Sequence, residues 1–226
     1  MVEISPYYNV ARSKKIVEQG DHRGAIGGMW DEIGKLQIDY LTKDGLAPAD
    51  RLLDVGCGCL RGGVHFVDYL DAGNYFGIDL SEDFLNAGYE VELAGLNLQH
   101  KLPRENLHTT SEFDATSFGV KFDAVLALSV FTHLPINHIK LCLARLAPSV
   151  RTGAKFYATF FNMPDDSDWT EPALHTPGGI TTYPDRDPYH YARGDVEFCR
   201  GLDWRLDRLE EWDHPRDQWM AVFVRT

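Results

Sequence analysis

The residues best placed to do chemistry gather in one glycine-rich segment, residues 52–63, which reads LLDVGCGCLRGG. The segment begins with a short apolar run, so a strand is expected to end and a helix to begin within it. Glycines at such a junction let the backbone turn tightly and approach a ligand, while free N–H groups at the helix start point outward. The segment therefore predicts a site for a nucleotide-containing ligand.

Two carboxylates narrow the choice of ligand. Asp54 lies two residues before Gly56, where it would repel a pyrophosphate and attract an ammonium or sulfonium group. Asp79 follows Gly58 by 21 residues, at the end of the next apolar run. An acidic side chain at that spacing can accept hydrogen bonds from both ribose hydroxyls. An adenosine that carries a cationic group fits both positions.

A dinucleotide site is an alternative interpretation of the same loop. The dinucleotide fingerprint needs glycines at relative positions 1, 3 and 6, but here they fall at Gly56, Gly58 and Gly62, with Arg61 at the sixth position. An NAD-dependent oxidoreductase would also have to tolerate Asp54 beside a pyrophosphate. A noncatalytic cofactor-binding protein stays open as a second alternative, because it would keep the loop without an acceptor cleft.

The elements that must position this loop alternate along the chain. Apolar runs predict five strands, at residues 51–55, 74–78, 106–110, 122–129 and 154–161. Residues 135–146 predict a crossover helix, and residues 195–200 a short helix. Residues 204–212 and 218–224 predict a hairpin, because five residues join them. We therefore expect an α/β fold with a doubly wound, mostly parallel seven-stranded sheet, Rossmann-like, that ends in an antiparallel hairpin strand.

The length of 226 residues indicates one domain, residues 1–226, with two additions. Residues 1–45 are expected to form an N-terminal helical cap, because apolar positions from Trp30 to Leu41 share one helical face. Residues 162–193 form a long irregular stretch rich in proline, aromatic and His residues. Loops of this length in compact domains are usually functional, so this stretch is predicted to be an acceptor-side insert.

Composition excludes several classes of protein. The net charge of -12 and the pI near 5.1 oppose binding to nucleic acid. The least polar stretch, residues 124–139, is too short and too polar to span a bilayer, and the first fifteen residues hold no signal-peptide pattern, so a cytoplasmic chain is expected. The four cysteines match neither a disulfide framework nor a zinc knuckle, so no metal is predicted.

Three segments in order, DVGCGCLRGG, YFGIDLS and KFDAVLALSVFTHL, resemble the class I S-adenosylmethionine-dependent methyltransferases. The resemblance implies S-adenosyl-L-methionine as cofactor, with the methionine part held by the glycine loop and the ribose by Asp79. It places Glu112 at the adenine amino group, with Asp114 as the alternate. Arg61 departs from the family's small residue and is expected to pair with a carboxylate, either the cofactor's own or that of a neighbouring acidic residue. The implied cofactor contacts are Asp54, Gly56, Cys57, Gly58, Arg61, Asp79, Leu80, Glu112, Phe113, Leu128 and Ser129.

Methyl transfer from a sulfonium is an in-line displacement, and a hydroxyl acceptor needs a base to remove its proton. His133, just beyond the fourth strand, is the first candidate, and His190, at the end of the insert, is the second. Residues 129–131 lack the motif of DNA amino-methylating relatives. We therefore expect O-methylation of a small-molecule or sugar-containing acceptor, without prediction of the acceptor's identity or of the oligomeric state.

Overall fold

An eight-stranded sheet organises the chain in the computed structural model, which describes residues 5–163 and 167–226. Residues 1–4 of the predicted cap and residues 164–166 of the predicted insert lie outside the described residues. Seven of its strands follow one another in a continuous order, which is β3 (Leu107–Thr109), β2 (Tyr75–Asp79), β1 (Leu52–Val55), β4 (Phe122–Ala127), β5 (Val150–Asn162), β10 (Gln218–Arg225) and β9 (Trp204–Glu210). The two-residue β8 (His190–Tyr191) pairs with the end of β5.

The strand directions confirm the predicted Rossmann-like topology. Strands β3 to β5 are parallel to one another, whereas β10 pairs antiparallel with both β5 and β9. The order reverses between β1 and β4, which is the position where open α/β sheets bind ligands. The predicted strands therefore fall on observed ones, with ends that differ by a few residues.

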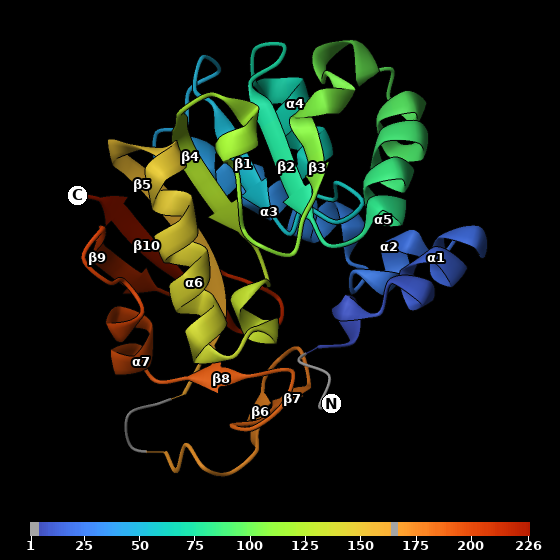
Figure 1. The fold of residues 1–226 in the computed structure, drawn as a ribbon. Coiled ribbons are helices and arrows are strands. Elements are labelled where there is room, and N and C mark those ends of the chain that lie inside the picture. Colours follow the sequence, from blue (N-terminus) through green and yellow to red (C-terminus); the bar gives the residue numbers. More distant parts are fainter. Residues whose placement is uncertain (1–4, 164–166) are drawn as a thin grey trace.

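Helices cover both faces of the sheet (Figure 1). One face carries α6 (Ile136–Leu146) and α7 (Arg193–Phe198), which pack with Leu53, Val55 and Phe156. The other carries α3 (Trp30–Lys43), α4 (Gly63–Tyr69) and α5 (Glu82–Ala87), which pack with Leu52, Leu126 and Tyr157. Neighbouring strand residues such as Leu52 and Leu53 point to opposite faces, and both are fully buried. This burial explains the continuous apolar runs of the central strands.

The predicted N-terminal cap divides into two parts. Helix α3 belongs to the sheet layer, since its Leu41 is fully buried in the core. Helices α1 (Val10–Glu18) and α2 (His22–Ala25) lie instead beside α5 (Figure 1). Glu92, in the π-helical segment Gly88–Leu93 that continues α5, accepts hydrogen bonds from the side chains of His22 and Arg23. This buried carboxylate ties the N-terminal part to the body of the domain.

The insert is more ordered than its sequence indicates. It contains a hairpin of β6 (Ala173–His175) and β7 (Ile180–Thr182), and then β8 (His190–Tyr191), which pairs in parallel with the end of β5. The prolines and the short strands hide this order from hydrophobic periodicity. Six 3₁₀ turns complete the described elements, at Pro6–Tyr8, Gln99–Lys101, Arg104–Asn106, Thr116–Phe118, Phe131–His133 and Ala147–Ser149.

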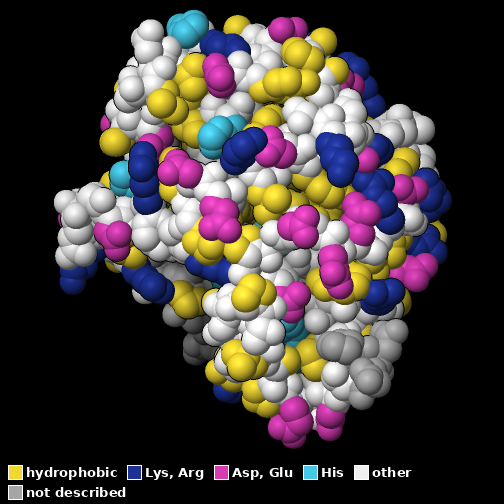
Figure 2. All heavy atoms as spheres, turned by 180° about the vertical axis from the view of Figure 1, so that it is seen from behind, with side chains coloured by type: hydrophobic (Ala, Val, Ile, Leu, Met, Phe, Trp, Pro, Cys, Tyr) yellow, Lys and Arg dark blue, Asp and Glu magenta, His cyan; other side chains and the backbone are white. Residues whose placement is uncertain are grey.

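Acidic and basic side chains are interspersed on the face seen in Figure 2, with apolar atoms between them. Among the described residues, no helix is long and apolar enough to cross a membrane. All four cysteines are buried and unpaired with one another.

Candidate cofactor and acceptor site

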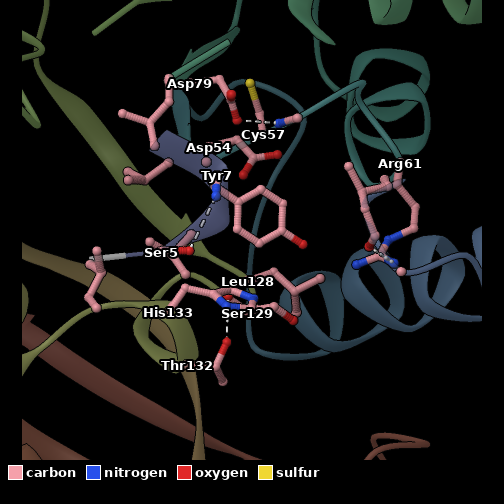
Figure 3. A pocket seen from close by; sticks show the side chains of 18 of the residues that line it. Ser5, Tyr7, Asp54, Cys57, Arg61, Asp79, Leu128, Ser129, Thr132 and His133 are labelled. Carbon is pink, nitrogen blue, oxygen red and sulfur yellow. Dashed lines mark hydrogen bonds between the residues drawn. The ribbon is translucent and has the colours of Figure 1, made fainter. Parts of the chain in front are cut away.

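A cavity of about 300 Å³ lies at the carboxyl ends of β1, β2 and β4. Its walls come from the glycine loop, the loops after β2 and β4, the N-terminal segment that precedes α1, the insert and the turn before β10. Figure 3 shows Asp54, Asp79 and Cys57 on one side of the cavity and Ser129, Thr132 and His133 on the other, with the Tyr7 ring between them. The cavity therefore brings the predicted cofactor loop and the predicted base His133 into one space.

Two glycines of the loop adopt conformations that other residues rarely reach. Gly56 has φ of +69° and Gly58 has φ of +55°. A Cβ atom at Gly56 would also lie 2.5 Å from the Cγ2 atom of Val130. Both glycines and Cys57 line the cavity, so the loop presents its backbone to a ligand at close range.

Asp79 lines the cavity at the end of β2, with its carboxylate held by two backbone N–H groups. The Gly58 N–H donates to Oδ2 and the Ser81 N–H donates to Oδ1, each at 2.8 Å. Burial raises the pKa of Asp79, and these N–H groups oppose that rise. Each oxygen can accept a further hydrogen bond, so the carboxylate is fixed in position and can still bind a ligand.

Asp54 is a buried carboxylate that lines the cavity at the end of β1. The Tyr75 hydroxyl donates a hydrogen bond of 2.7 Å to its Oδ2 atom. Burial raises the pKa of Asp54 to about 7, since desolvation outweighs the bond from Tyr75, and nearby Asp79 adds to the rise. A cation in the cavity would lower this pKa, because it would stabilise the ionised form.

Arg61 lines the cavity from the loop just before α4 and is only 7% exposed. Its Nη1 atom donates to the carbonyl oxygens of Ile26 and Gly28, rather than to a carboxylate of the protein. Its Nε atom is buried and has no partner among the described residues. Burial, together with the charge of Arg216, lowers the pKa of Arg61 to about 10. Among the described residues no neighbouring acid pairs with Arg61, which leaves the cofactor's own carboxylate as the predicted partner.

The loop after β4 contributes Leu128 and Ser129 to the cavity. Ser129 has φ of +55°, and its N–H donates to the Oγ1 atom of Thr159 at 2.7 Å. Both hydroxyls, of Ser129 and Thr159, donate to the Oε1 atom of Gln218. These bonds join β4, β5 and β10 beneath the cavity and fix the strained loop in place.

His133 lies at the cavity beside the insert and the N-terminal segment. Its Nδ1 atom is 2.6 Å from the Oδ1 atom of Asp187, while the Ser5 hydroxyl donates to the other carboxylate oxygen of Asp187. The Tyr7 ring packs edge-on against the imidazole, with ring centroids 4.7 Å apart. Because a carboxylate accepts at Nδ1, the proton of a neutral His133 is held there, and Nε2 is left as the acceptor.

Some predicted site residues do not reach the cavity. Glu112 is exposed and forms an ion pair with Arg145, and its alternate Asp114 is exposed and caps Thr116. The intervening Phe113 lines the cavity with φ of +53°. Leu80 lines it as well.

His190 also lies outside the cavity lining, although it is buried. Its Nδ1 atom contacts the Thr182 hydroxyl at 2.8 Å, and its Nε2 atom contacts the carbonyl oxygen of Trp169 at 3.0 Å. Thr182 in turn contacts His175, which meets Asp217 in the turn before β10. These bonds hold the insert together and leave His190 no ring nitrogen for an acceptor.

Reasoning from the sequence assigned no role to four residues of this site: Tyr7 and Arg216 line the cavity, and Asp187 and Tyr75 bond to the lining residues His133 and Asp54. Tyr75 begins the strand that ends in Asp79 and lies opposite Leu52 in the parallel pairing, so it shares a face of the sheet with Asp54, two residues further along β1. Asp187, Tyr7 and Arg216 have no comparable local signal. They come from the insert, the N-terminal segment and the turn before β10, which only the complete fold brings together.

Comparison with known proteins agrees with this site. Residues 53–156 match the family described as "Methyltransferase domain". The ubiquinone biosynthesis O-methyltransferase of Aromatoleum aromaticum is 31% identical over 133 residues, which are 57% of this chain and 51% of that relative. The chain thus spans about half the length of this curated relative.

Two solved structures share the fold. Magnesium protoporphyrin IX methyltransferase from Synechocystis PCC 6803, solved with bound S-adenosylmethionine, is 17% identical with a TM-score of 0.62, and the match covers 95% of this chain and 97% of that one. The glycopeptide N-methyltransferase MtfA, solved with S-adenosylhomocysteine, is 14% identical with a TM-score of 0.63, covering 87% and 90%. The two act on different acceptors, so the shared fold does not identify the acceptor.

Proposed function

We propose that the chain is a class I S-adenosylmethionine-dependent methyltransferase and that it transfers the methyl group to a hydroxyl of a small-molecule or sugar-containing acceptor. The observation that carries this proposal is the couple of His133 and Asp187 on the same cavity as the glycine loop. The name of the curated relative, an O-methyltransferase, supports the same acceptor atom.

The donor set around the glycine loop suits the cofactor. The cofactor supplies an electrophilic methyl group on a sulfonium, together with an amino group, a carboxylate and a ribose. Asp54 offers a buried carboxylate for the cationic part, and Asp79 offers oxygens for the ribose hydroxyls. Arg61 offers an unpartnered buried Nε–H for an anionic oxygen. Every charged part of the cofactor thus has a complementary side chain in this half of the cavity.

His133 would act as the general base. Asp187 accepts the Nδ1 proton, fixes the tautomer and stabilises the imidazolium that forms when Nε2 takes a proton. Ser5 holds the second oxygen of Asp187, so the carboxylate cannot rotate away from the imidazole. Removal of the acceptor's proton at Nε2 would make the hydroxyl oxygen a better nucleophile as it attacks the methyl carbon.

Apolar side chains dominate the acceptor side of the cavity, with Phe161, Ile180 and Pro188 among them. Such walls, with a few polar groups between them, are typical of small-molecule sites. They would exclude water from the reacting atoms, so that hydrolysis of the sulfonium does not compete.

The test is methyl transfer from S-adenosylmethionine to 3,4-dihydroxybenzoate, to its amide and to methyl glucoside, followed by release of S-adenosylhomocysteine and by mass spectrometry of the product. We expect an O-methylated product from at least one of the three. His133→Gln should lower kcat by about 100-fold, because general bases contribute about that factor or more. The affinity for S-adenosylhomocysteine should stay within threefold.

His138→Gln is the matched control, since His138 lies nearby at the start of α6 and does not line the cavity. Its activity should match that of the parent. An O-methylated product formed at the parental rate by His133→Gln would exclude His133 as the base. Cofactor binding without transfer to any of the three probes would contradict the proposed acceptor class.

A further inference from the structure

The cavity holds two guanidinium groups without a protein carboxylate to balance them. Arg61 and Arg216 both line it, and neither forms an ion pair with any residue in the described ranges. Arg61 donates to the carbonyls of Ile26 and Gly28, and Arg216 donates to the carbonyl of Gly27 that lies between them. Carbonyl dipoles stabilise a cation but do not neutralise its charge. This end of the cavity is therefore positively charged.

The two arginines reach the Gly27 loop from opposite directions. Arg61 lies in the glycine-rich segment, two residues before α4, on the cofactor side. Arg216 lies in the turn before β10, and a Cβ atom at Gly178 of the insert would lie only 2.6 Å from its Cα atom. Two residues further on, Gln218 holds the Ser129 hydroxyl beneath the acceptor half of the cavity. Arg216 thus belongs to the insert side of the cavity.

The carboxylates in and beside the cavity have other hydrogen-bond partners, and none of them pairs with Arg61 or Arg216. Asp187 is bonded to His133 and Ser5, and Asp54 is bonded to Tyr75. Asp79 is held by the backbone. The cofactor carries one carboxylate, and Arg61 with its unpartnered buried Nε atom is the group on its side. Arg216 then still has only the Gly27 carbonyl as a hydrogen-bond acceptor and no carboxylate among the described residues, so its guanidinium is available to a second anion.

We infer that the acceptor is anionic, a hydroxylated compound with a carboxylate or another acidic group, and that Arg216 binds this group while the hydroxyl faces His133. This inference rests on the proposed function and adds the substrate class. Arg216 would act as a specificity-determining residue, because a guanidinium forms two parallel bonds with a carboxylate and fixes the orientation of the molecule that carries it.

The test is calorimetric titration of the protein, saturated with S-adenosylhomocysteine, with 4-hydroxybenzoate and with 4-hydroxybenzamide. The two probes differ in charge and match closely in size. We expect the acid to bind at least tenfold more tightly than the amide. Arg216→Gln should remove this preference and leave the affinity for S-adenosylhomocysteine within threefold. Arg216→Lys keeps the charge and should keep part of the preference.

Arg200→Gln is the matched control, because Arg200 is exposed, lies outside the cavity lining and carries the same charge. It should leave the preference for the acid unchanged. Arg61→Gln should instead weaken S-adenosylhomocysteine binding, since Arg61 faces the cofactor's carboxylate.

Three results would overturn the inference. The first is that the acid binds no more tightly than the amide, or fails to bind. The second is that the preference for the acid survives in Arg216→Gln. The third is that Arg216→Gln weakens S-adenosylhomocysteine binding tenfold, which would assign Arg216 to the cofactor's carboxylate. Different outcomes test the proposed function. A preference for the acid without methyl transfer to any hydroxyl would leave the anion site standing and contradict O-methylation. Equal methylation of the amide by the parent and by Arg216→Gln would leave O-methylation standing.

Discussion

The two halves of the cavity are built by different means. In the cofactor half, short-range contacts dominate: Asp79 is bonded to Gly58, 21 residues earlier, and to Ser81, two residues later. In the acceptor half, His133 meets Asp187 across 54 residues, and Asp187 meets Ser5 across 182. Backbone N–H groups and glycine conformations define the first half, whereas side chains from separate segments define the second.

The difference has a consequence for how each half can change. Substitutions in the insert or the N-terminal segment alter the acceptor walls without touching the backbone that holds Asp79. The same cofactor half can then serve different acceptors, which is how one fold supports many activities. Variants in the two halves should accordingly separate cofactor affinity from turnover.

The largest expected effect belongs to the insert. Replacing residues 167–185 by a short Gly-Ser linker removes β6, β7 and Ile180 from the acceptor walls. Methyl transfer should fall by more than about 100-fold, because orientation of the acceptor contributes several kcal/mol to such displacements. The affinity for S-adenosylhomocysteine should stay within a few fold, as calorimetry would show.

A narrower variant guards against misfolding of the shortened protein. Ile180→Ser keeps the hairpin and changes one wall residue, and it should raise the KM of the acceptor with little change in cofactor affinity. Near-parental turnover in both variants would mean that the insert is not an acceptor wall. The comparison between the halves would then fail on the acceptor side.

The second effect lies in the cofactor half. Asp79→Ala should weaken S-adenosylhomocysteine binding at least tenfold, since charge-assisted hydrogen bonds contribute roughly 1.5–3 kcal/mol each. Glu82→Gln is the control, because Glu82 is exposed at the start of α5 and outside the cavity lining, and it should bind like the parent. An unchanged dissociation constant for Asp79→Ala, measured by calorimetry, would show that the ribose lies elsewhere.

The smallest expected effect is the release of a proton from Asp54 when the cofactor binds. The pKa of Asp54 is about 7 in the folded protein and near 3.8 in an unfolded chain, so ionising it costs stability as the pH rises from about 4 to about 7. A cationic ligand lowers this pKa. At pH 6, binding of S-adenosylmethionine should therefore release up to about one proton, detected as a dependence of the calorimetric heat on the buffer's ionisation enthalpy.

Asp54→Asn provides the control for this measurement, because the amide does not titrate. Its binding heat at pH 6 should show no dependence on the buffer. A parent protein with the same buffer-independent heat would mean that the cation of the cofactor does not lie beside Asp54.

The features of the fold and the site that could be predicted are those determined by residues close together in the sequence. The strands β4 and β5 are buried on both faces and appear as continuous apolar runs, and the loop after β1 has glycines where positive φ is needed. Asp79 then follows from the spacing of one βαβ unit. The family resemblance rests on the same local signals, so it was strongest in the cofactor half.

The structure departs from the predictions that depended on where a side chain points after a strand ends. Glu112 and Phe113 are neighbours, yet only Phe113 lines the cavity, because its positive φ turns the loop and leaves Glu112 towards Arg145. His190 was expected at an acceptor, but pairing of β8 with β5 places it among the internal bonds of the insert. No spacing in the sequence reports such turns.

The contact between Arg216 and Gly27 also bears on the order of events during biosynthesis. Their bond spans 189 of the 226 residues, and β10 must enter between β5 and β9 to carry Arg216 there. Contacts of such long sequence separation carry a large loop-closure entropy cost, which slows folding. A nascent chain that ends before residue 216 lacks one wall of the cavity. The cofactor half can therefore form before this contact exists, whereas the acceptor half is complete only after β10 has joined the sheet.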